Sequence, residues 1–193
     1  MAQYRGLTRW EAIGCAAAAL LATIVSLFLT TPATALLGGC LFFAALTIAV
    51  IDYRNFIIPD SLSLPAIPFG VFASFVSVDV DLRQSAITSS LIGALVGGCS
   101  FYAVRSAYRR LRGFEGLGMG DVKLAAAAGA WVGIEGLPIV LFMATGAAVS
   151  TVAVKHVIGT KESISRTTPV PFGSFLAPSL WLVWLSQQLA APL

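Results

Sequence analysis

Residues 34–51 read TALLGGCLFFAALTIAVI, a stretch of 18 residues without a charged side chain. As a helix this stretch is about 27 Å long, close to the ~30 Å hydrocarbon core of a bilayer. Similar stretches fill most of the chain: 58% of its 193 residues are hydrophobic and only 11% are charged. Because a soluble domain carries about 25% charged residues, the sequence predicts an all-α, polytopic helical membrane protein.

Short polar, glycine-rich or proline-containing segments separate these apolar stretches. The seven predicted spans are 12–30, 34–51, 61–78, 85–104, 121–135, 137–154 and 171–190. The fifth is short for a crossing, since 15 helical residues cover about 22 Å, and a single span over 121–154 is the alternative. No internal repeat or linker divides the chain, so we expect one transmembrane domain, residues 1–193.

Lysine and arginine residues gather on one side of the predicted membrane. If the N-terminus is cytoplasmic and the spans alternate, Arg83 is the only basic residue of the twelve on the outer side. The other eleven are Arg5, Arg9, Arg54, Arg105, Arg109, Arg110, Arg112, Lys123, Lys155, Lys161 and Arg166. This bias predicts a cytoplasmic N-terminus and an outer C-terminus. Cleavage of residues 1–35 as a signal peptide is an alternative that leaves the later orientation unchanged.

The composition excludes several classes of function. A net charge of +3 is too small for a surface that reads nucleic-acid phosphates. Cys15, Cys40 and Cys99 form no C-x-x-C pair, which argues against a disulfide framework or a thiolate zinc site. His156 is the only histidine, whereas an H-E-x-x-H metalloprotease needs two. We therefore expect no metal and no cofactor.

Two aspartates stand where a carboxylate needs an explanation. Asp52 follows the apolar run 46–51 at the C-terminal end of its predicted span, facing the negative end of the helix dipole. Asp121 follows three glycines in the five residues 116–120. The simpler readings are an ion pair of Asp52 with Arg54 and a helix N-cap for Asp121.

The two carboxyl groups are predicted at one depth, on the cytoplasmic side, against apolar surroundings. Paired carboxyl groups in such surroundings are typical of aspartic proteases. From the helix ends and the apolar neighbours of Asp52, we expect Asp52 to hold the shared proton and Asp121 to be the base. A transporter or channel that binds cations or protons at the two acids is the rival interpretation.

Three segments resemble the motifs of the type IV prepilin peptidases. IDYR at 51–54, followed by IPDSL at 58–62, resembles their first aspartate motif. GMGDVKL at 118–124 is similar to their second, the G-x-G-D motif. PFG at 171–173 with FLA at 175–177 is similar to their C-terminal segment.

The resemblance implies an intramembrane aspartic endopeptidase with catalytic segments 51–62 and 116–124. Such enzymes work without a metal and cleave the basic leader of type IV prepilins or pseudopilins after a glycine. The hydrophobic helix of the substrate lies in the bilayer, and the cut is made at the cytoplasmic face of the bacterial inner membrane. Asp52 and Asp121 would be catalytic, one polarising the scissile carbonyl and the other activating water. The remaining motif residues would bind substrate or shape the site: Pro59, Gly118, Gly120, Lys123, Pro171, Phe172 and Gly173.

Two neighbours of the motifs have simpler expected roles. Asp60 follows Pro59 at the start of the third predicted span, so we expect it to be an N-cap. Lys123 is expected to extend its ammonium group toward the membrane interface.

The chain departs from the larger members of the family between its first two spans. Those members carry a cytoplasmic insertion with paired C-x-x-C motifs, linked to methylation of the new N-terminus. Here a short segment around Pro32 joins the two spans, so the chain resembles the peptidase-only forms. A preflagellin peptidase with the same aspartate pair is the alternative within the enzyme class.

Overall fold

The structure, a computed structural model, describes residues 6–113, 116–157 and 171–190, and these residues form helices and no strand. The chain is thus an all-α, polytopic membrane protein, as the sequence predicted. In chain order the elements are α1 (Arg9–Leu27), α2 (Pro32–Asn55), α3 (Asp60–Val76), η1 (Val80–Leu82), α4 (Arg83–Arg112), α5 (Met119–Val157) and α6 (Gly173–Ala190). Arg5, Lys161 and Arg166, which entered the charge count, lie outside the described residues.

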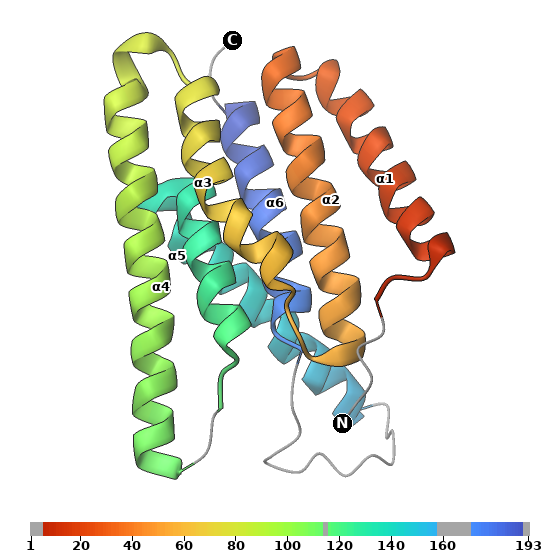
Figure 1. Ribbon diagram of the computed structural model, residues 1–193, viewed down its shortest axis with the longest axis vertical. Helices are drawn as coiled ribbons and strands as arrows, with labels where there is room; N and C mark the ends of the chain where they lie inside the picture. Colours follow the sequence, from red (N-terminus) through yellow and green to blue (C-terminus); the bar gives the residue numbers. More distant parts are fainter. Residues whose placement is uncertain (1–5, 114–115, 158–170, 191–193) are drawn as a thin grey trace.

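The helices run up and down in one bundle (Figure 1). α2 ends, and α3, α5 and α6 begin, toward the lower end of the bundle in that view. By length and composition, four described helical stretches could cross a membrane, namely α1, α2, Val80–Arg112 and Met119–Val154, and α3 is a shorter apolar helix. Large apolar side chains such as Phe28 and Phe142 are exposed on the outside of the bundle, which suits contact with lipid.

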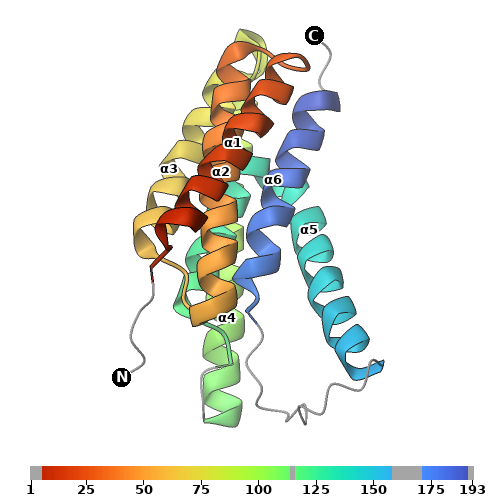
Figure 2. The ribbon, with the colours of Figure 1, turned by 90° about the vertical axis from the view of Figure 1, so that its right-hand side faces the viewer.

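The break predicted between 121–135 and 137–154 lies inside α5, at Gly133. Its φ of 71° and ψ of −179° belong to a region that is essentially restricted to glycine. The Ser89 hydroxyl of α4 accepts the Ile134 N–H at 3.2 Å and donates to Glu135 Oε2 at 2.6 Å, so it satisfies polar groups that the break leaves free. After the break the chain turns back toward the end where α5 began (Figures 1 and 2). Two segments therefore replace a single span over 121–154.

Glycines set the distance between α4 and α5. A Cβ at Gly93 would collide with the carbonyl oxygen of Gly129, and one at Gly97 with that of Ala125. Without side chains at these positions the two backbones approach closely. The first part of α5, which carries Asp121, is thereby fixed against α4.

The core lies where α2, α5 and α6 meet. Ile48, Leu124, Leu176 and Trp184 are each at most 2% exposed there. The Trp184 ring packs edge-on against Trp131 of α5, with centroids 5.5 Å apart. Because this core joins the three helices whose ends carry the predicted motifs, it fixes their relative positions.

Candidate active site

Asp52 is buried at the last turn of α2, with 4% of its surface exposed. Its Oδ2 accepts the backbone N–H of Ser174 at 2.9 Å and lies 3.3 Å from the Ser174 hydroxyl, which also donates to the Ala49 carbonyl at 3.0 Å. The suggested pairing with Arg54 is wrong, because the Arg54 guanidinium forms an ion pair with Glu11 of α1. Asp52 thus points into the bundle toward α6.

Asp121 lies in the first turn of α5, which begins at Met119. Its Oδ2 accepts the N–H of Gly118 at 3.2 Å, whereas its Oδ1 is buried and has no hydrogen-bond partner within the described part of the chain. The helix therefore starts before Asp121, so the interpretation of Asp121 as its N-cap is wrong. One carboxylate oxygen is left for another partner.

The structure brings the two aspartates to the same site: Gly120, which precedes Asp121, packs on the same isoleucine as Gly173, and a Cβ at Gly173 would be 3.0 Å from Asp52 Oδ2. Ile58, in the segment between α2 and α3, lies between the starts of α5 and α6. A Cβ at Gly120 would be 2.7 Å from Ile58 Cβ, and one at Gly173 would be 2.6 Å from Ile58 Cδ1. These two motif glycines allow α5 and α6 to close around Ile58.

Asp60 and Lys123 meet across the site. The N-cap of α3 is Pro59, and Asp60 is the first residue of the helix, so the expected N-cap role of Asp60 is wrong. Its Oδ1 instead accepts a hydrogen bond from the Lys123 ammonium at 2.7 Å. Lys123 has a partner on α3 and ties that helix to the first turn of α5.

The segment 171–173 leads into α6, which begins at Gly173. The carbonyl of Phe172 accepts the N–H groups of Phe175 and Leu176, both at 3.0 Å. The Ser174 N–H donates to the Pro171 carbonyl at 3.2 Å as well as to Asp52 at 2.9 Å. These contacts direct Ser174 toward Asp52. The sequence pattern did not identify Ser174, because a serine that follows a motif gives no signal of an aspartate 122 residues away.

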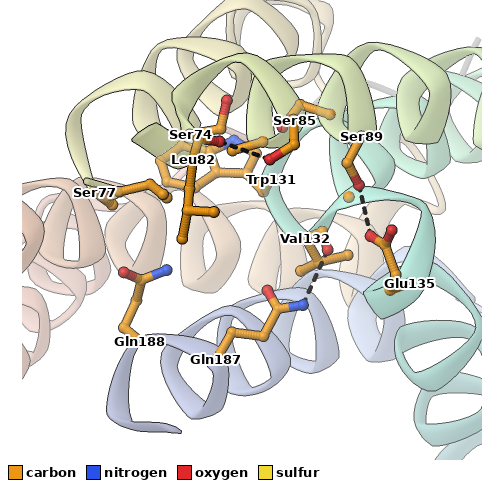
Figure 3. A pocket seen from close by; sticks show the side chains of 14 residues that line it. Ser74, Ser77, Leu82, Ser85, Ser89, Trp131, Val132, Glu135, Gln187 and Gln188 are labelled. Atoms are coloured by element: carbon orange, nitrogen blue, oxygen red, sulfur yellow. Dashed lines mark hydrogen bonds between the residues drawn. The ribbon is translucent and has the colours of Figure 1, made fainter. Parts of the chain in front are cut away.

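A polar cavity of about 420 Å³ lies elsewhere, around the break in α5 (Figure 3). Figure 3 shows Ser85, Ser89 and Glu135 on one side of it, and Gln187 donating to the Val132 carbonyl, a bond of 3.0 Å. None of the predicted site residues lines this cavity. Its polar groups therefore belong to the break in α5 and not to the aspartate site.

Comparisons with known proteins place the two aspartates in a family context. Residues 39–153, which include both, match the model of the type IV leader peptidase family. The prepilin leader peptidase/N-methyltransferase of Burkholderia pseudomallei (strain 1026b) is 37% identical over 170 residues, which are 88% of this chain and 52% of that protein. The protein of the same name from Dichelobacter nodosus is 36% identical over 151 residues, which are 77% and 49% of the two chains.

A third relative of that name, from Aeromonas salmonicida (strain A449), is 32% identical over 169 residues, covering 86% of this chain and 55% of the relative. The chain spans about half the length of these curated relatives. No solved structure matched it. Since the family model covers more than half of the 193 residues and contains both aspartates, the chain belongs to the type IV leader peptidase family.

Proposed function

We propose that this chain is an intramembrane aspartic endopeptidase that removes the leader of type IV prepilins or pseudopilins. One observation carries the proposal: Asp52 and Asp121, from motifs 69 residues apart (121 − 52), lie together where α2 ends and α5 begins. Two carboxyl groups that interact in apolar surroundings can share one proton, which is the arrangement that aspartic proteases use.

The reaction follows from two carboxyl groups in different protonation states. The ionised carboxylate takes a proton from water as the water oxygen attacks the scissile carbonyl. The protonated carboxyl group donates its proton to the carbonyl oxygen, which avoids a free oxyanion in the apolar site. The tetrahedral diol then collapses: the C–N bond breaks, the amine takes the first proton, and the second returns to its carboxyl group.

The charges around the site support a cytoplasmic position. α4 runs from Arg83 at one end of the bundle to Arg109, Arg110 and Arg112 in its last turn at the other, the end at which α2 finishes (Figure 1). Arg54 lies at the same end. Because cytoplasmic segments are rich in Lys and Arg, we place the aspartates at the cytoplasmic face of the bacterial inner membrane.

A cleavage assay with the purified full chain in lipid vesicles tests the proposal. The substrate is a synthetic peptide with a basic leader, a glycine and a hydrophobic helix, and mass spectrometry locates the cut. Cleavage after the glycine is expected, and the Asp79→Asn variant should match the wild type because Asp79 makes no side-chain cap bond at η1. An uncut peptide, together with proton flux across the vesicles that Asp52→Asn abolishes, would support the transporter instead.

A further inference from the structure

Ser174, at the start of α6, donates hydrogen bonds to the carboxyl group of Asp52. Its backbone N–H, in the first turn of α6, is 2.9 Å from Oδ2, and its hydroxyl proton is shared between Oδ2 and the Ala49 carbonyl. N–H groups in the first turn of a helix have no partner within the helix and carry partial positive charge, so they stabilise an anion. Both contacts favour a negative charge on Asp52.

Asp121 is held differently. It accepts a longer hydrogen bond, from Gly118 at 3.2 Å, and its Oδ1 is buried without a partner among the residues that the structure describes. A buried carboxylate oxygen that accepts no hydrogen bond is costly. A protonated Oδ1, in contrast, presents a donor to a carbonyl that enters the site.

We propose that Ser174 is a positioning residue that holds Asp52 as the carboxylate, so that Asp52 activates water and Asp121 supplies the proton to the scissile carbonyl. This inference rests on the peptidase function proposed above. It reverses the assignment from the helix ends of α2 and α5, because charge-assisted hydrogen bonds outweigh a helix-end effect. The contacts come from α6, which the helix-end argument did not include.

In the reaction, the water proton moves to Asp52 as the new C–O bond forms, and the Asp121 proton moves to the carbonyl oxygen. When the C–N bond breaks, Asp52 returns its proton to the amine and Asp121 recovers its own from the diol. The resting state is restored with no net proton gain.

Within the described part of the chain, Asp121 is the titratable group on which the charge of Asp52 acts. The other acids on packed helices are engaged: Glu11 of α1 with Arg54, and Asp60 of α3 with Lys123. α6 contributes Ser174 and no charged residue within Gly173–Ala190. A change at Ser174 therefore acts on Asp52 without removing a charge.

Kinetics of three variants test the role of the hydroxyl. Ser174→Ala is expected to lower kcat by about 10-fold to 100-fold with little change in KM, because the base loses a charge-assisted hydrogen bond. The acid limb of its pH profile should move to higher pH, since a carboxylate with fewer donors takes up a proton more readily. Ser174→Thr should restore most of kcat. The control is Ser186→Ala, which should leave kcat unchanged, because the Ser186 hydroxyl donates to the Val183 carbonyl of the same helix. A loss confined to KM, or an unmoved acid limb, would overturn the proposal.

Infrared spectroscopy of the resting protein tests the proton assignment without substrate. It therefore gives a result for this inference even if the prepilin peptide is not cleaved. The protonated carboxyl band should keep its position in Ser174→Ala at neutral pH, because the band belongs to Asp121. A shift of that band would mean that the proton sits on Asp52 and that Ser174 contacts the acid form.

Discussion

At the scale of single residues, the sequence located the two aspartates but not their partners. Asp52 was conspicuous because it ends an apolar run, and Asp121 because glycines precede it. Ser174 and Lys123 lie 122 and 63 positions from the acids that they contact, so no local pattern could reveal these bonds. The N-cap prediction for Asp60 failed by one residue, because Pro59 takes the N-cap position and Asp60 begins the helix.

Replacement of Asp60 by Asn is expected to have a small effect. The Asp60 side chain is 61% exposed, and exposed ion pairs contribute about 0–1 kcal/mol to stability. Cleavage should stay within about 3-fold of wild type, and the unfolding midpoint in detergent should move little. A loss of cleavage comparable to that of Asp52→Asn would show that Asp60 takes part in the chemistry.

At the scale of elements, hydropathy predicted the helices and missed some of their ends. The predicted span 85–104 covers the N-terminal two thirds of α4. The helix continues to Arg112, because long basic side chains can extend toward water and need no apolar run. The break within 121–154 was predicted between residues 135 and 137 but lies at Gly133. The prediction relied on proline as a sign of a helix break. The backbone at this break instead has a positive φ, which glycine tolerates, so the break falls at Gly133.

A methyl group at Gly97 should loosen the packing of α4 on α5. Gly97→Ala would force its Cβ onto the Ala125 carbonyl, and such overpacking costs about 1–3 kcal/mol. The matched control is Gly146→Ala, because a Cβ at Gly146 would have no atom of the described residues within 4 Å. Thermal unfolding in detergent should show a lower midpoint for the first variant only, and equal midpoints would contradict the close contact.

At the scale of the whole molecule, the up-and-down bundle follows from the alternation of apolar and polar segments, but the meeting of the aspartates does not. It depends on the second part of α5 turning back at Gly133, so that α6 begins at the end where α2 finishes (Figure 2). The core around Trp184, together with Ile58 between two glycines, then sets the geometry of the site.

The orientation of the bundle can be read with reporter fusions. A reporter placed after Gly113 should be cytoplasmic, because α4 ends there in a basic turn, and one placed after Asp81 should lie on the opposite side. A phosphatase that is active only outside the cytoplasm and a fluorescent protein that is active only inside give opposite signals. The same signal at both positions would rule out α4 as a crossing helix.

Methyl transfer is not expected from this chain alone. Residues 28–31 join α1 to α2 and contain no cysteine, and Cys15, Cys40 and Cys99 lie within helices as free thiols. Incubation with cleaved peptide and S-adenosylmethionine labelled in its methyl group should leave the peptide unlabelled. Label on the new N-terminus would refute this expectation.

The central claim is that Asp52 and Asp121 form one catalytic pair, and the cleavage rate of single Asp→Asn variants tests it most directly. Asparagine is nearly isosteric with aspartate, so Asp52→Asn and Asp121→Asn should fold like the wild type, which thermal unfolding can verify. Each should lower the rate of prepilin cleavage by at least about 1,000-fold. The double variant should be no slower than either single variant, because the effects of mutating residues that act as a unit are not additive. Near-normal cleavage by either folded single variant would contradict the account.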